Sequence, residues 1–204
     1  MEVASGMSID EKILNSYGGE SKLYKTSELI FSEGDMPLYY FQIIKGIVKL
    51  NNYNEEGKEF IHNILNEEQS FGEALIFLDK AYPINAETLV ATEVMRVPKS
   101  NFLEMMNDHP SISTQMNYSF SQQIYFKLIM IQHIASHNPM VRIKALIDYL
   151  KSSQQEVDAF AFQIPLTRQQ IADFTGLRVE TVIRTLKKME NSNLLKIENR
   201  KILY

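Results

Sequence analysis

The stretch from Pro110 to His137 limits the possible folds more than any other feature of this sequence. It contains no glycine and no proline after its first residue, so it predicts one helix that is long for a globular protein. Between residues 124 and 135 apolar side chains lie on almost every side of this helix. A helix that is apolar all round must be buried on two faces, and it therefore needs two partners.

Four apolar residues indicate what one of these partners is. Ile124, Leu128, Ile131 and Ala135 follow a 4-3-4 spacing, which is typical of a helix face that pairs with a copy of itself. The other face can then pack on the rest of the chain. The alternative is the central helix of a monomer, but two-sided burial favours a homodimer with these four residues at its interface.

Before this helix the sequence is typical of a β domain. Short apolar runs alternate with turn signals that include Gly34, Gly46 and Gly57. The runs cover residues 29–31, 39–44, 47–50, 60–65, 87–90 and 94–97. Short strands separated by glycine-containing turns predict an antiparallel sandwich or barrel, followed by a short helix over residues 101–108.

The composition excludes several classes of site. The chain has no cysteine, so disulfides, thiolate zinc sites, cysteine-ligated iron–sulfur clusters and cysteine nucleophiles are excluded together. No apolar run approaches the roughly 20 residues that span a bilayer, and the first residues lack the pattern of a secretory signal. We therefore expect a cytoplasmic protein that does not enter membranes.

The net charge of −4 is unevenly distributed. Residues 139–204 carry 11 Lys and Arg against 7 Asp and Glu, whereas residues 1–138 carry 10 against 18. A basic C-terminal part attached to an acidic one indicates a polyanion as partner.

The basic part contains the pattern of a helix-turn-helix. Asn138 and Pro139 are a helix cap and a first helical residue, and Thr167 with Gln170 forms a capping box that opens a second helix. Gly176 then breaks the chain before a third helix over residues 179–189, whose positions 182, 186 and 189 are apolar. Two helices that meet at a steep angle through such a short turn are typical of DNA-binding proteins.

The third helix offers polar residues on its other side. Glu180, Thr181, Arg184, Lys187 and Lys188 share the exposed face, and strands at 194–197 and 202–204 around residues 198–201 form a hairpin that can serve as a wing. The alternative is a helical hairpin with a charged, solvated face. The capped first helix, the basic domain and the base-reading residue types near the N-terminus of the third helix favour DNA binding.

These residues also carry a family resemblance. The segment TRQQIADFTGLRVETVIRTLKKMENSNLLKI resembles the C-terminal domain of the Crp/Fnr regulators, and ELIFSEGD, LYYFQIIKGIVKL, NEEGKEF and QSFGEAL resemble their β-roll in the same order. The resemblance implies an α+β fold with three parts. By this resemblance, residues 1–109 form an antiparallel β-roll of the cyclic-nucleotide-binding type, which is a double-stranded β-helix. Residues 110–137 form a long dimerisation helix, and residues 138–204 form a winged helix-turn-helix.

The resemblance also implies roles for single residues. Glu180 and Arg184 align with base-reading positions, with Thr181 beside them. Arg can bind guanine O6 and N7, and Glu can accept from cytosine N4. Val179 and Ile183 depart from the polar residues of some relatives. Positions that align with or suit contacts to the DNA backbone are Thr167, Arg168, Gln169, Arg178, Lys187 and Lys188.

The resemblance is weakest where the family binds its effector. Residues 71–75 resemble the start of a phosphate-binding cassette, but Ile84 stands where the cassette needs an arginine, and no Lys or Arg lies between Lys80 and Arg96. A buried phosphate without a cation is poorly compensated, so we do not expect a cyclic nucleotide. The expected effector pocket comprises Phe71, Gly72, Glu73, Ala74, Leu75, Ile84, Asn85 and Ala86.

Other effectors and functions stay open as alternatives. His133 and His137 have the i, i+4 spacing of metal ligands, and because the family includes haem sensors, a haem or another small molecule is an alternative effector. A cupin-like enzyme would need several histidines on the strands, where only His62 lies. We therefore predict a non-enzymatic regulator whose partners are double-stranded DNA, a second copy of the chain and RNA polymerase.

Overall fold

The computed structural model describes residues 7–134, 136–152 and 160–204. The chain forms two compact units that separate between Ser121 and Gln122, inside helix α4 (Pro110–Ile134). The three-part division made from the sequence stays a prediction, and Ala135 lies outside the described residues. Within the described ranges, no helix is both long and apolar enough to span a membrane.

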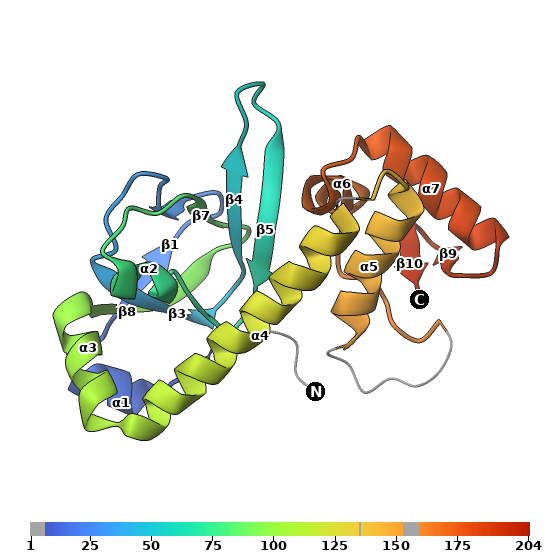
Figure 1. Cartoon of the computed structure of the whole chain (residues 1–204). Helices are drawn as coiled ribbons and strands as arrows, with labels where there is room; N and C mark the ends of the chain where they lie inside the picture. The colour runs from blue at the N-terminus through green and yellow to red at the C-terminus, as the bar shows by residue number, and fades with distance from the viewer. Residues whose placement is uncertain (1–6, 135, 153–159) are drawn as a thin grey trace. The chain divides into compact units, whose positions relative to one another are not determined.

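The first unit is built on two four-stranded antiparallel sheets (Figure 1). The first sheet contains, in order, β1 (Glu20–Tyr24), β8 (Thr92–Pro98), β3 (Tyr39–Lys45) and β6 (Ser70–Phe71). The second contains β2 (Leu29–Phe31), β7 (Asn85–Thr88), β4 (Val48–Tyr53) and β5 (Glu59–Leu65). The expected antiparallel β-roll is therefore confirmed.

Aromatic side chains form one core of this roll. The rings of Phe31 and Tyr82 stack with centroids 3.7 Å apart, and those of Phe41 and Phe71 stack at 5.4 Å. Val48, Ala86 and Val94 are fully buried in the same cluster. Packing of this kind stabilises a roll through apolar burial and through the favourable geometry of ring pairs.

A second core lies on the other face of the first sheet, under a layer of helices. Helices α1 (Glu11–Ser16) and α3 (Lys99–Asp108) and the start of α4 gather there (Figure 1). Tyr40 of β3 stacks on Phe102 of α3 with centroids 4.5 Å apart, and Leu14, Met105 and Met116 are buried around them. This core fixes the first turns of α4 to the roll.

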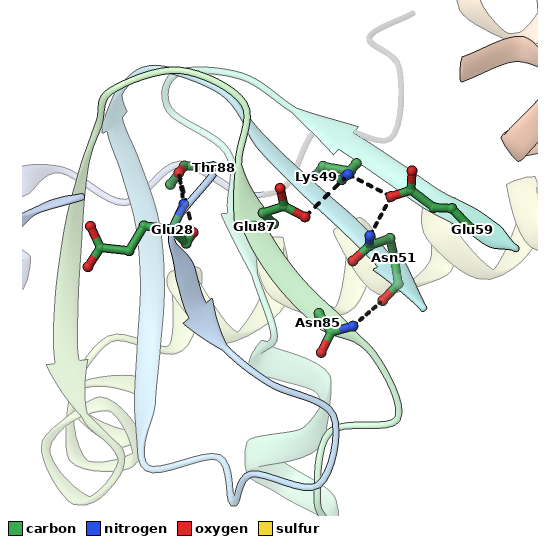
Figure 2. Close-up of polar contacts among 7 residues, drawn as sticks. All are labelled: Glu28, Lys49, Asn51, Glu59, Asn85, Glu87 and Thr88. Carbon is green, nitrogen blue, oxygen red and sulfur yellow. Dashed lines mark hydrogen bonds and ion pairs between the residues drawn. The ribbon is translucent and has the colours of Figure 1, made fainter. Parts of the chain in front are cut away.

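A polar network crosses strands β5, β4 and β7 (Figure 2). The Lys49 ammonium lies 2.6 Å from Glu59 and 3.3 Å from Glu87, and the Asn51 amide also donates to Glu59. Asn85 donates to the Asn51 carbonyl at 3.4 Å. Burial alone would lower the pKa of Lys49, but hydrogen bonds and charge pairing with the two carboxylates outweigh burial and raise it. Sequence analysis did not find this network.

Among its described residues, the second unit contains the second half of α4, three further helices and a hairpin. These further elements are α5 (Pro139–Ser152), α6 (Arg168–Thr175), α7 (Val179–Asn191), β9 (Lys196–Glu198) and β10 (Lys201–Leu203). The Asn138 side chain accepts the backbone N–H of Met140 at 3.0 Å, as the predicted cap requires. Their shared core includes Ile143, Leu146 and Phe162.

Several details differ from the sequence-based expectations. The strand expected at 87–90 is Asn85–Thr88. Residues 160–164 alternate in the sequence as a strand does, but in the structure they form only a bridge from Gln163 to Leu203. The wing turn is shorter than expected, because Asn199 and Arg200 adopt positive φ of 50° and 65° and close a two-residue hairpin. The sequence did not predict α1, β1, β6 or α2 (Glu73–Leu78). Three of them are too short to show a period, and β1 is mostly exposed.

Candidate nucleic-acid interface and effector region

Helix α6 begins at the predicted capping box. The Thr167 hydroxyl accepts the Gln170 N–H at 3.1 Å, and the Gln170 side chain accepts the Thr167 N–H at 2.9 Å. Gly176 ends the helix with a φ of 66°, a left-handed conformation that favours glycine. Ala172 is fully buried, which lets the two helices approach closely.

Helix α7 is strongly amphipathic. Val182, Leu186 and Met189 are fully buried. The opposite stripe is exposed and consists of Glu180, Ile183, Arg184, Lys187, Lys188 and Asn191. Arg178 stands at the N-cap and makes no capping bond with its side chain, so its exposed guanidinium is available for a contact outside the helix.

The exposed stripe lines an open groove of about 650 Å³. Its lining residues are Arg168, Glu180, Ile183, Arg184, Lys187, Lys188, Asn191 and Ile197. Four cationic side chains against one carboxylate make the groove basic. The groove therefore combines cations, which attract phosphates, with the hydrogen-bonding groups that read base edges.

Arg168 lines this groove, whereas the predicted interface residues Thr167, Gln169, Arg178 and Thr181 are not among its lining residues. Arg168 donates to the carbonyl of Arg200 in the wing turn at 3.2 Å, and Gln169 donates to Asp173 at 2.9 Å. Thr181 is half-buried, and its carbonyl accepts the Thr185 hydroxyl at 2.7 Å. Glu180 and Arg184, the two base-reading candidates, are both exposed.

Glu190 is a residue that sequence analysis missed. It pairs with Lys187 at 3.0 Å and accepts the backbone N–H of Ile197, in β9, at 3.1 Å. The hydrogen bond from Lys187, followed by the one from Ile197, lowers the pKa of Glu190. The carboxylate thus ties the wing to α7, and the only sequence signal was an acidic residue three positions after a lysine.

Arg142 is a second residue that was missed. It lies in the first turn of α5 and donates to the carbonyl of Ser136 at 2.7 Å and to that of Thr175 at 3.3 Å. Thr175 is the last residue of α6. One guanidinium therefore connects the start of α5 to the end of the first helix of the helix-turn-helix.

The residues of the expected effector pocket lie in different environments. Phe71, Glu73 and Ala86 are buried, and Gly72 has a φ of 79°. A Cβ on Gly72 would lie 3.1 Å from the Tyr82 ring, so the aromatic core fills the space beside this glycine. Burial, and then the Glu73 carboxylate, raise the pKa of Tyr82 well above its ordinary value.

Three further positions help to define this region. Ile84 packs against the aromatic core, as a core residue does. Asn85 belongs instead to the polar network of Figure 2 and hydrogen-bonds Asn51. Ala74 is exposed on α2. The structure thus separates Ala74 and Asn85 from the buried members of the predicted pocket.

The predicted histidine pair does not share a helix. Helix α4 ends at Ile134, and His137 lies in the link to α5. The helical i, i+4 geometry expected of His133 and His137 is therefore wrong. Among the residues that the structure describes, no three His, Asp or Glu side chains gather in the manner of a metal site.

The predicted dimer face of α4 is exposed within this single chain. Ile124, Leu128 and Ile131 are 59%, 61% and 65% exposed. On another side of the helix, Met130 is buried and Phe126 stacks on Tyr149 of α5. A contiguous stripe of exposed apolar side chains is typical of a protein interface.

Comparison with known protein families matches both units. Residues 21–109 match the cyclic nucleotide-binding domain, and residues 141–204 match the Crp-like helix-turn-helix domain. The chain belongs to the Crp/Fnr family. It is thus a DNA-binding transcription regulator and not an enzyme, which confirms the function class inferred from the sequence.

Individual relatives are distant but cover most of the chain. The cAMP-activated global transcriptional regulator CRP of Salmonella typhimurium is 26% identical over 184 residues, which are 88% of this chain and 87% of that protein. Transcriptional activator protein FnrA of Stutzerimonas stutzeri is 25% identical, and the alignment covers 87% of this chain and 73% of that protein.

Solved structures show the same fold. A CooA mutant from Carboxydothermus hydrogenoformans has a TM-score of 0.79 at 17% identity, with 94% of this chain and 84% of that one covered. The c-di-GMP responsive regulator CLP of Xanthomonas campestris has a TM-score of 0.76 at 18% identity, with 95% and 98% covered. At such identities the likeness concerns the fold alone.

Proposed function

We propose that this regulator binds a two-fold-symmetric DNA site as a homodimer, and that its roll responds to a ligand other than a cyclic nucleotide. The observation that carries the DNA part is the exposed stripe of α7 in a basic groove, with Glu180 and Arg184 near the helix N-terminus. The N-terminal residues of a recognition helix are those that reach base edges in the major groove.

Specific roles follow from the chemistry of each side chain. Arg184 takes a guanine through O6 and N7, and Glu180 accepts from the amino group of a cytosine. Thr181 adds a further contact beside them. By family resemblance the half-sites contain a TGA-like core, and a dimer presents its two recognition helices about 34 Å apart, one helical turn of DNA.

The backbone contacts surround this centre. Thr167, Arg168 and Gln169 lie at the start of α6, where helix N-termini and cations bind phosphates. Arg178, Lys187 and Lys188 add positive charge at either end of α7. Their role is affinity and register on the DNA and not sequence choice.

The apolar stripe of α4 supports the homodimer. Three side chains at the predicted spacing are each about three-fifths exposed, and a second copy would cover them with the same residues, as a two-fold interface requires. The relative FnrA, which is named as a transcriptional activator protein, supports RNA polymerase as a further partner.

The roll argues against a cyclic nucleotide as the ligand. Ile84 replaces the arginine of the cassette and packs in the aromatic core, and Gly72 lies against Tyr82 and Phe31. A cyclic phosphate buried here would lack a bidentate cation. Haem-dependent sensing through His133 and His137 has little support, because these residues do not share a helix.

Selection from randomised DNA followed by substitution tests the DNA-binding role. We expect a palindromic site, and Arg184→Ala should lose about 1–3 kcal/mol of binding free energy and relax selectivity at one guanine. Arg168→Ala or Arg178→Ala should weaken all sequences similarly and flatten the salt dependence by about one unit. The proposal is abandoned if no palindrome is selected, or if Arg184→Ala binds the selected site as tightly as the wild type.

A further inference from the structure

Ile183 is an apolar exception on the recognition face. Among the described residues of α7 it is the one large apolar side chain that is exposed, with 49% of its surface accessible. It lies between Glu180 and Arg184 on the exposed stripe. The buried side of the helix is already filled by Val182 and Leu186, which are fully buried, so Ile183 is not needed for the core.

The surroundings of Ile183 show what kind of contact it can make. It lines the basic groove together with Ile197 of the wing and with the cations of the stripe. An isoleucine side chain makes no hydrogen bond and no ion pair, so it adds nothing to phosphate binding. It gains free energy only when an apolar group of the ligand covers it.

We propose that Ile183 makes this regulator specific for a thymine, by packing on the thymine 5-methyl group. That methyl is the one apolar group that base edges present in the major groove. This inference rests on the proposed DNA binding through α7 and deepens it, because it names a second kind of base recognition beside the polar contacts of Glu180 and Arg184.

The position of Ile183 in the helix restricts which thymine is recognised. Ile183 directly precedes Arg184 and follows Glu180 by three residues, so it lies on the same stripe as both. The thymine therefore lies within about two base pairs of the guanine that Arg184 takes.

The test replaces single thymines of the selected site by deoxyuridine, which differs from thymidine only in the missing methyl. For the wild type, a uracil in one half-site should weaken binding about fourfold, and a uracil in both half-sites about fifteenfold, as expected for one buried methyl in each half-site. Ile183→Ser should bind the thymine and uracil sites equally. Ile183→Val keeps two methyl groups and should stay sensitive to the thymine methyl.

Leu194→Ala is the matched control. Leu194 is another exposed apolar residue of this unit, 38% accessible and outside α7, so its variant should show the same uracil response as the wild type. If the selected site binds but no thymine methyl matters, or if Ile183→Ser stays as sensitive as the wild type, the inference about Ile183 is wrong while the DNA-binding proposal stands. If selection yields no site at all, the DNA-binding proposal itself fails.

Discussion

The stripe of α4 permits a quantitative prediction about assembly. Leu128 is 61% exposed in the single chain, and full burial of a leucine is worth about 1.5–3 kcal/mol. Covering the exposed part in a dimer therefore contributes about 1–2 kcal/mol per protomer, and about 2–4 kcal/mol for the two copies. At 1.4 kcal/mol for each tenfold change, Leu128→Ala should raise the dimer Kd about 30- to 700-fold.

Sedimentation equilibrium over a dilution series would measure this Kd. The wild type should be dimeric at micromolar concentration, and Leu128→Asp should yield monomers or aggregate, because it places a charge in the apolar interface. Lys127→Ala, at the adjacent exposed position, should leave the Kd nearly unchanged. A monomeric wild type, or a Leu128→Ala dimer as tight as the wild type, would refute the assignment of this interface.

Three further predictions concern the roll and α5. Because Ile84 replaces the phosphate-binding arginine, calorimetry should detect no binding of cyclic AMP or cyclic GMP at physiological concentrations, and micromolar affinity for either would contradict this. Lys49→Met leaves Glu59 and Glu87 without their cation. The substitution should lower the free energy of unfolding, measured in urea, by about 1–3 kcal/mol. This loss is smaller than that for breaking a fully buried ion pair, because the two carboxylates are about one-fifth exposed. Unchanged stability would contradict the role of the network. Burial raises the pKa of Tyr149 to about 12, above its unfolded value of about 10. The contribution of Tyr149 to stability is therefore present below pH 10 and lost as the pH rises toward 12. Between pH 10 and pH 12 the urea midpoint of Tyr149→Phe should therefore fall less steeply with pH than that of the wild type. Equal slopes for the two proteins would contradict this role of Tyr149.

The helix-turn-helix could be predicted from the sequence because its signals are local. Thr167 and Gln170 lie three residues apart and bond each other directly, and Gly176 marks the one left-handed residue that ends α6. The apolar positions of α7 follow the helical period and are buried as predicted. Such signals need only a few neighbouring residues, so tertiary context does not override them.

The polar network of the roll could not be predicted, because its members come from three strands. Lys49 pairs with Glu59 of β5 and Glu87 of β7, and nothing in the local sequence shows which strands are neighbours. The register shift between Leu50 and Asn51 further changes which β5 residues face β4, so even a correct list of strands would have given the wrong partners.

The prediction for the histidine pair failed although its signal was local, because the helix ends before it reaches the second histidine. His133 and His137 would share a face only if α4 continued beyond Ile134. Asn138 and Pro139 begin the next helix, and His137 lies before them outside any helix. The sequence showed a helix stop at residue 138, but it did not show that α4 already ends at Ile134.

The two exposed stripes have opposite chemistry, and this separates assembly from DNA binding. The stripe of α4 is apolar, so its burial in a dimer is driven by the hydrophobic effect, which salt does not screen. The stripe of α7 carries Arg184, Lys187 and Lys188, so its binding to DNA releases counterions and weakens steeply as salt rises. Added salt should therefore release the DNA from an intact dimer. The contact proposed for Ile183 is apolar, although it lies inside the salt-sensitive surface. Its share of the binding free energy therefore persists at salt concentrations where the phosphate contacts have weakened. Discrimination of thymine from uracil should then not fall as salt rises.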